Sequence, residues 1–128
     1  MEPAPLARVR QITGNLPGVT EHVSHGAPCF FVRRDRPICY FHDHHSGDHR
    51  VTIWCPSPPG VADELAEADP DRFFRPQPSA SGAFAVWLGV VLDPPPAGGV
   101  DWDEVAAVIE DAFRMVAPRR LVRELDDR

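Results

Sequence analysis

A histidine-rich turn holds the densest group of potential metal ligands in the sequence. The imidazoles that could act as ligands are His42, His44 and His49, and the carboxylates Asp43 and Asp48 lie among them. Imidazole and carboxylate groups bind zinc, nickel and copper, and alternate residues of a strand share one face, so His42 and His44 could converge on one ion. A functional metal centre also needs outer groups that hold its ligands in place. The turn shows no sign of them, so we interpret it as solvated and expect neither a metal site nor another cofactor.

A second candidate for a binding cleft is His25, which is followed by Gly26. Glu21 precedes it by four residues, so one turn of helix would place the carboxylate beside the imidazole. The alternative is a structural hydrogen bond that fixes the corner between a helix and the next strand. The sequence otherwise lacks nucleophile-elbow, zinc-protease and phosphate-loop motifs. We therefore expect no enzymatic activity.

The arginines Arg33, Arg34, Arg36 and Arg50 fall around the ends of predicted strands, and Trp54 lies on the strand that begins with the last of them. Arginine beside aromatic side chains is typical of surfaces that bind nucleic acid or phosphate. Charged residues at turns and sheet edges also prevent strands from pairing with the wrong partner. Both interpretations stay open from the sequence alone. Together with the glutamate–histidine pair, these five residues form the predicted binding surface.

Composition sets limits on the partner and the compartment. All 13 basic residues are arginine, yet 19 acidic residues give the 128-residue chain a formal net charge of −6. This balance disfavours DNA as a partner, because nucleic-acid-binding domains are usually basic. The three cysteines have no CxxC spacing, so we expect buried free thiols in a reducing cytoplasm. We find neither a signal peptide nor an apolar run of the ~18 residues that a membrane span requires, and we expect no membrane association.

The elements that must position these residues follow from apolar periodicity and from breaks at proline and glycine. One helix is predicted over 5–16, and two strands over 27–33 and 37–42 form a hairpin around a tight turn. The other predicted elements are strands over 50–55, 71–76 and 83–92, helices over 61–68 and 101–117, and a last helical turn over 119–126.

The predicted order α-β-β-β-α-β-β-α indicates a single α+β domain over residues 1–128. We expect two layers, in which an antiparallel sheet of about five strands carries helices mainly on one face. The strand over 83–92 is apolar on both faces, and Trp54 points away from the other apolar residues of its strand. Unless long loops cover it, the second face of the sheet is therefore predicted to bind a protein, a small molecule or a second copy of the chain.

Several motifs occur in the order found in one known family. They are Leu16-Pro17-Gly18-Val19-x-Glu21, His25-Gly26-x-Pro28-x-Phe30, Trp87-Leu88-Gly89-Val90-x-Leu92-Asp93, Asp101-Trp102-x-Glu104 and Ala117-Pro118-Arg119-Arg120-Leu121. Through these motifs, which span nearly the whole chain, the sequence resembles the MmcQ/YjbR-like proteins. The resemblance implies a compact α/β fold similar to secretion chaperones and CyaY, and a "double wing" DNA-binding role suggested for some members. It supplies no catalytic residues, and this chain has Arg36 and Arg119 where relatives often have lysine.

These observations predict a cytoplasmic, non-enzymatic binding module with an unidentified protein or small-molecule partner. One alternative is a DNA-binding protein that uses the arginine-bearing hairpin, and another is a metal- or small-ligand-binding protein that uses the histidine-rich turn. Steep salt dependence of binding would identify the first alternative. Stoichiometric metal in the purified protein would identify the second.

Overall fold

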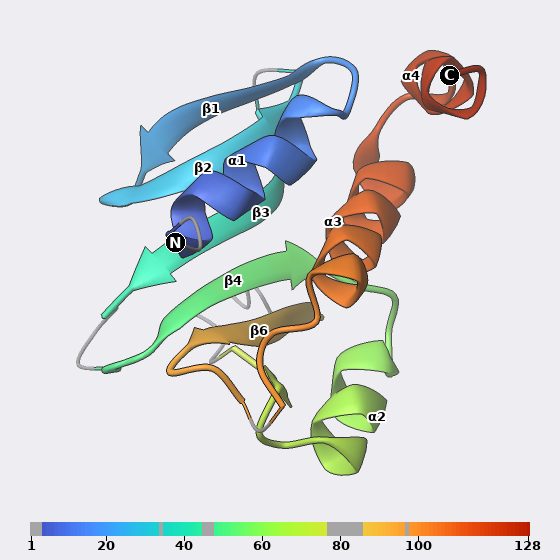
Figure 1. Ribbon diagram of the computed structural model, residues 1–128. Coiled ribbons are helices and arrows are strands. Elements are labelled where there is room, and N and C mark those ends of the chain that lie inside the picture. The colour runs from blue at the N-terminus through green and yellow to red at the C-terminus, as the bar shows by residue number, and fades with distance from the viewer. Residues whose placement is uncertain (1–3, 34, 45–47, 77–85, 97) are drawn as a thin grey trace.

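The computed structural model describes residues 4–33, 35–44, 48–76, 86–96 and 98–128, and Figure 1 shows how its layers are arranged. A six-stranded sheet has the order β1-β2-β3-β4-β6-β5 with antiparallel neighbours throughout. The predicted α+β class is thus confirmed. The strands are β1 (Val19–Ser24), β2 (Ala27–Val32), β3 (Arg36–Asp43), β4 (Val51–Pro56), β5 (Phe73–Phe74) and β6 (Trp87–Asp93). The helices are α1 (Pro5–Gly14), α2 (Val61–Ala68), α3 (Trp102–Val116) and α4 (Arg119–Asp126).

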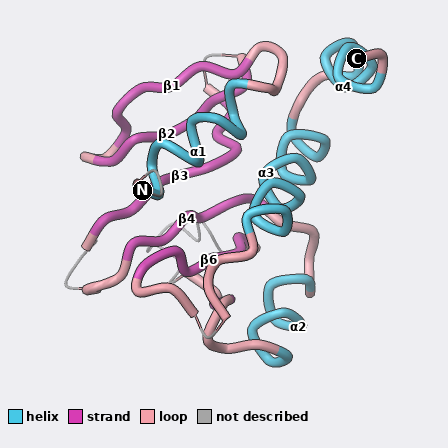
Figure 2. The backbone as a smooth tube through the Cα atoms, viewed as in Figure 1, coloured by secondary structure: helices cyan, strands magenta, loops and turns pink. Residues whose placement is uncertain are grey.

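The helices α1 and α3 lie on one face of the sheet, as Figure 2 shows. The side chain of Asp101 accepts a hydrogen bond from the backbone N–H of Glu104 at 3.1 Å, which caps α3 as the sequence predicts. The buried stripe of α3 packs against β3 and β4 and closes the main core. Among the described residues, no helix combines the length and the apolar composition that a membrane crossing requires.

The sheet has one strand more than the expected five, because β1 was not predicted from the sequence. The four central residues of β1 are exposed, and this edge strand pairs with β2 alone. Periodicity detects a strand through its buried face, and β1 buries too little of either face to show one. The first helix also ends at Gly14, two residues before the predicted end.

The second face of the sheet, opposite α1 and α3, is buried as well. Cys29, Phe31 and Tyr40 form a separate cluster there, against which Trp54 and Trp87 pack. Tyr40 is only 6% exposed. The predicted strand over 83–92 begins at residue 87, and its residues 83–85 lie outside the described part of the chain. Three side chains of this face are therefore buried, whereas Trp54 and Trp87 are half-buried.

Candidate functional site

Two of the predicted binding arginines flank the turn between β2 and β3. Arg33 follows β2 directly and has a φ of +56°, which is uncommon for a residue other than glycine. Arg36 is the first residue of β3, and both side chains are exposed. Arg34 lies outside the described residues. The hairpin therefore presents at least two guanidinium groups at its tip.

The helix α4 packs against the same end of the sheet. Its buried Leu121 lies over Gly18, where an added Cβ would be 2.8 Å from the Leu121 Cδ1 atom. Gly18 leads into β1, and Val19 of β1 pairs with Val32 at the end of β2. The first turn of α4 and the β2–β3 turn thus share one end of the molecule (Figure 1).

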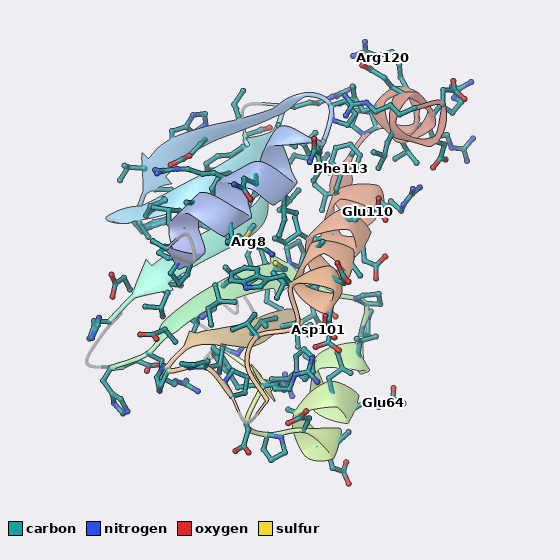
Figure 3. All side chains as sticks on the ribbon, in the orientation of Figure 1. Arg8, Glu64, Asp101, Glu110, Phe113 and Arg120 are labelled. Carbon is teal, nitrogen blue, oxygen red and sulfur yellow. The ribbon has the colours of Figure 1, made fainter. Side chains whose placement is uncertain are left out.

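This helix adds three exposed arginines, Arg119, Arg120 and Arg123. We refer to them, together with Arg33 and Arg36, as the arginine end. Figure 3 shows Arg120 on the outer side of α4, pointing away from the body of the protein. The sequence predicts Arg119 only as a replacement for lysine and gives no connection between α4 and the hairpin. The Pro-Arg-Arg run was the available signal, but only the contact between Gly18 and Leu121 brings the two segments together.

Most other arginines are neutralised by carboxylates. Their ion pairs are Arg10–Glu21, Arg50–Asp48, Arg72–Glu104, Arg75–Asp63 and Arg114–Asp126. Within the described part of the chain, no carboxylate lies within 4.0 Å of an arginine of the arginine end. The guanidinium groups of this surface are therefore available to an external anion.

The negative charge of the protein is unevenly distributed. Asp35, Glu124 and Asp127 lie in or next to the segments of the arginine end and weaken its field, and Asp126 of α4 pairs with Arg114. Many other acids lie on α2 and on the first turn of α3. Figure 3 shows Glu64 and Asp101 far from Arg120. A net charge of −6 therefore coexists with one end that carries an excess of unpaired arginines.

The start of α4 strengthens this positive character. Its first turn contains Arg119 and Arg120 and no acidic residue, and Pro118 at the N-cap provides no side-chain cap. A helix N-terminus carries partial positive charge and exposed N–H groups. Two arginines at this position are unfavourable by themselves, and a bound anion would relieve their repulsion with the helix dipole. Arginine also suits phosphate, because its planar fork donates two parallel hydrogen bonds.

The structure separates Glu21 from His25, contrary to the predicted partnership. Glu21 lies on the strand β1 rather than on a helix and accepts hydrogen bonds from Arg10 at 2.9 and 2.8 Å. These hydrogen bonds lower the pKa of Glu21. His25 and Gly26 have φ values of +52° and +79° and form the two-residue turn between β1 and β2. Positive φ at both positions is the type I′ geometry that matches the twist of a hairpin.

Arg50 and Trp54 do not join the arginine end. Arg50 lies before β4, at the opposite end of β3 from Arg36. Its guanidinium donates to both carboxylate oxygens of Asp48 at 2.8 to 3.1 Å, and it lies 4.4 Å above the ring of Phe74. Trp54 is half-buried against the aromatic cluster of the second face. Both residues therefore serve the packing of that face.

The Asp48–Arg50 pair predicts an effect of pH on stability. The hydrogen bond from Arg50 lowers the pKa of Asp48 below its ordinary value of 3.8. A lowered folded-state pKa means that the pair stabilises the fold above about pH 4 and that this contribution is lost as the pH falls further. We expect Asp48→Asn to cost about 0.5 kcal/mol at neutral pH, with the difference from wild type shrinking towards about pH 3. Thermal unfolding of both proteins across this pH range tests the prediction. A stability difference between them that does not change with pH would contradict it.

The histidine-rich turn does not form a metal centre in the described residues. His42 is 4% exposed and stacks on Tyr40 with a centroid distance of 5.8 Å. His44 is exposed and forms a hydrogen bond with Asp43, and His49 is exposed. Among the residues that the structure describes, no group of three or more histidine, cysteine or acidic side chains could hold a metal ion.

All three cysteines are free and buried. Burial raises the pKa of the Cys29 thiol to about 12. The pKa of Cys39 is also raised, first by its hydrogen bond with Cys55 and then by burial. Since the thiolate is the nucleophilic form, these two residues are structural at neutral pH, in agreement with the predicted role in the core.

The fold and these surfaces define a small α+β domain with buried thiols and an exposed arginine end. The model of the YjbR family matches residues 14–115, and the chain belongs to this family. The fold is similar to the crystal structure of the Deinococcus radiodurans protein DR2400, which has the domain DUF419. The TM-score is 0.67 at 16% identity, over 94% of this chain and 87% of that chain. No curated protein matches the sequence.

Proposed function

We propose that the protein is a non-enzymatic binding module that holds a phosphate-rich partner, a nucleic acid in the first instance, at its arginine end. One observation carries the proposal: five exposed arginines from the β2–β3 turn and α4 meet at one end of the molecule without carboxylate partners among the described residues. Guanidinium groups hold phosphate in bidentate hydrogen bonds. The acidic remainder of the chain does not oppose this contact strongly, because salt screens charges beyond about 8 Å at physiological ionic strength.

We also propose a cytoplasmic location for this module. Three free buried thiols support it, because a reducing compartment keeps cysteines in that form. The raised pKa values of Cys29 and Cys39 support a role other than nucleophilic catalysis.

Titration of a fluorescently labelled short DNA duplex with untagged protein, followed by anisotropy, tests the proposal. We expect a Kd in the micromolar range at low salt and a steep loss of affinity as salt rises. Arg120→Ala should weaken binding and reduce the slope of log K against log salt by about 1, as expected when one phosphate contact is lost.

Arg75→Ala is the matched control. It makes the same change in net charge, and Arg75 lies beyond β5, where it pairs with Asp63 at 2.8 Å. The affinity of the Arg75→Ala variant for the duplex should equal that of wild type. An equal loss in both variants would show that net charge rather than the arginine end governs binding. Absence of binding at low salt would exclude nucleic acid as the partner.

A further inference from the structure

The sheet divides into two separate hairpin ends between β2 and β3. The β2–β3 pairing runs no further than Cys29 and Tyr40. Beyond that pair, β2 continues to pair with β1 as far as Ala27, and β3 continues to pair with β4 as far as Asp43. The ends of β2 and β3 visibly diverge in Figure 1. We refer to the space between them as the sheet split.

The sheet split is a cavity with a volume of about 280 Å³. Its apolar walls are Leu6 of α1, Ala27 at the start of β2 and Phe41 of β3. The sheet split therefore suits a molecule of the size of a single amino acid.

The backbone along the sheet split can form hydrogen bonds with a ligand. A strand that leaves its neighbour turns a row of N–H and C=O groups towards the gap. On β3 this row comes from Phe41 and Asp43, which have no partner on β2 within the described ladder, whereas the backbone groups of His42 face Thr52 of β4. Phe41 is buried, and buried peptide groups need a hydrogen-bond partner. A ligand with both donors and acceptors would supply one.

The two lips of the cavity carry complementary polar groups. His25, from the β1–β2 turn, is exposed, and in the described part of the chain its imidazole has no hydrogen-bond partner. Asp43, at the end of β3, forms the other lip, where its carboxylate is held by His44. A carboxylate has lone pairs for further donors besides that histidine. One lip can thus donate to an anionic group while the other accepts from a cationic one.

We propose that the sheet split binds a small zwitterionic ligand of the amino-acid type. The ligand carboxylate lies at His25, its ammonium group lies at Asp43, and an aliphatic side chain packs against Leu6 and Phe41. The site is at the opposite end of β2 from the arginine end. It therefore stands independently of the proposed nucleic-acid contact, and the Arg120→Ala variant should bind the ligand as wild type does.

L-Leucine is the first probe, and its two derivatives that each lack one charge are the comparison. N-Acetyl-L-leucine removes the ammonium group, and L-leucinamide removes the carboxylate. In ¹H–¹⁵N correlation spectra, leucine should cause saturable shifts at residues 25–27 and 41–43 with a Kd in the millimolar range. Each derivative should bind about 10-fold more weakly, which corresponds to the loss of one charge-assisted hydrogen bond.

Two variants test which residue of the cavity contacts the carboxylate of the ligand and which contacts its ammonium group. His25→Asn removes the imidazole but keeps a residue that tolerates positive φ, and it should abolish the discrimination against leucinamide. Asp43→Asn should abolish the discrimination against N-acetyl-leucine. His49→Asn, an exposed histidine outside the cavity, is the matched control and should leave all three affinities unchanged. The proposal is overturned if leucine causes no saturable shift, if all three probes bind equally, or if the two lip variants behave like the control.

Discussion

Replacement of Phe113 by alanine is expected to lower the free energy of unfolding by about 3–5 kcal/mol. Phe113 lies on the buried face of α3 and has no exposed surface. Its ring fills the main core between this helix and the sheet, so truncation removes apolar contacts and leaves a cavity. Since small domains are stable by only about 5–15 kcal/mol, this loss is a large part of the total.

Urea denaturation measures the effect as a lower midpoint with an unchanged m-value. Met115→Ala is the matched control, because Met115 is on the same helix but 49% exposed. It should change stability by less than about 0.5 kcal/mol. If Phe113→Ala does not fold, Phe113→Leu gives a smaller loss of the same kind. Equal stability of the Phe113 and Met115 variants would mean that α3 does not pack on the sheet through this face.

Gly89→Ala is expected to destabilise the protein by about 1–3 kcal/mol through overpacking. Gly89 of β6 pairs with Phe74 of β5, and an added Cβ would overlap the Phe74 ring. The ring cannot turn away freely, because the guanidinium of Arg50 lies over it. Without this ring, alanine would be preferred to glycine in a strand by about 0.5–1 kcal/mol.

The double variant separates steric overlap from every other cause. In a Phe74→Ala background, Gly89→Ala should cost nothing or should stabilise the fold. The coupling energy from the four unfolding free energies should therefore exceed about 1 kcal/mol. An equal cost of Gly89→Ala in both backgrounds would place its cause in the backbone of β6 rather than in contact with Phe74.

Local signals in the sequence were sufficient to predict the helices and strands that bury one regular face. The apolar stripe of α3 and its cap at Asp101 predict that helix to within a residue of its observed start. The hairpin of β2 and β3 follows from two apolar runs around a charged turn. In both cases the physical cause of the structure acts over a few neighbouring residues, so that the pattern can be read directly.

Features that depend on contacts between distant segments could not be predicted in this way. The predicted pairing of Glu21 with His25 assumes helical spacing, because an exposed edge strand has no apolar alternation, and the true partner Arg10 belongs to α1. The arginine end depends on the packing of Leu121 over Gly18. The sheet split depends on where the pairing of β2 and β3 stops. None of these contacts has a local signature in residue type or spacing.

The separation of positive and negative charge gives the protein a dipole moment as well as a net charge. Acids on α2 and α3 and arginines on α4 and the β2–β3 turn form the two poles of a molecular dipole. A negatively charged partner exerts a torque on such a dipole before contact and rotates α4 towards itself. Electrostatic guidance of an encounter depends on this distribution of charge. The orientation of the protein towards a charged molecule therefore depends on where the thirteen arginines lie, even in a chain that carries six more negative charges than positive ones.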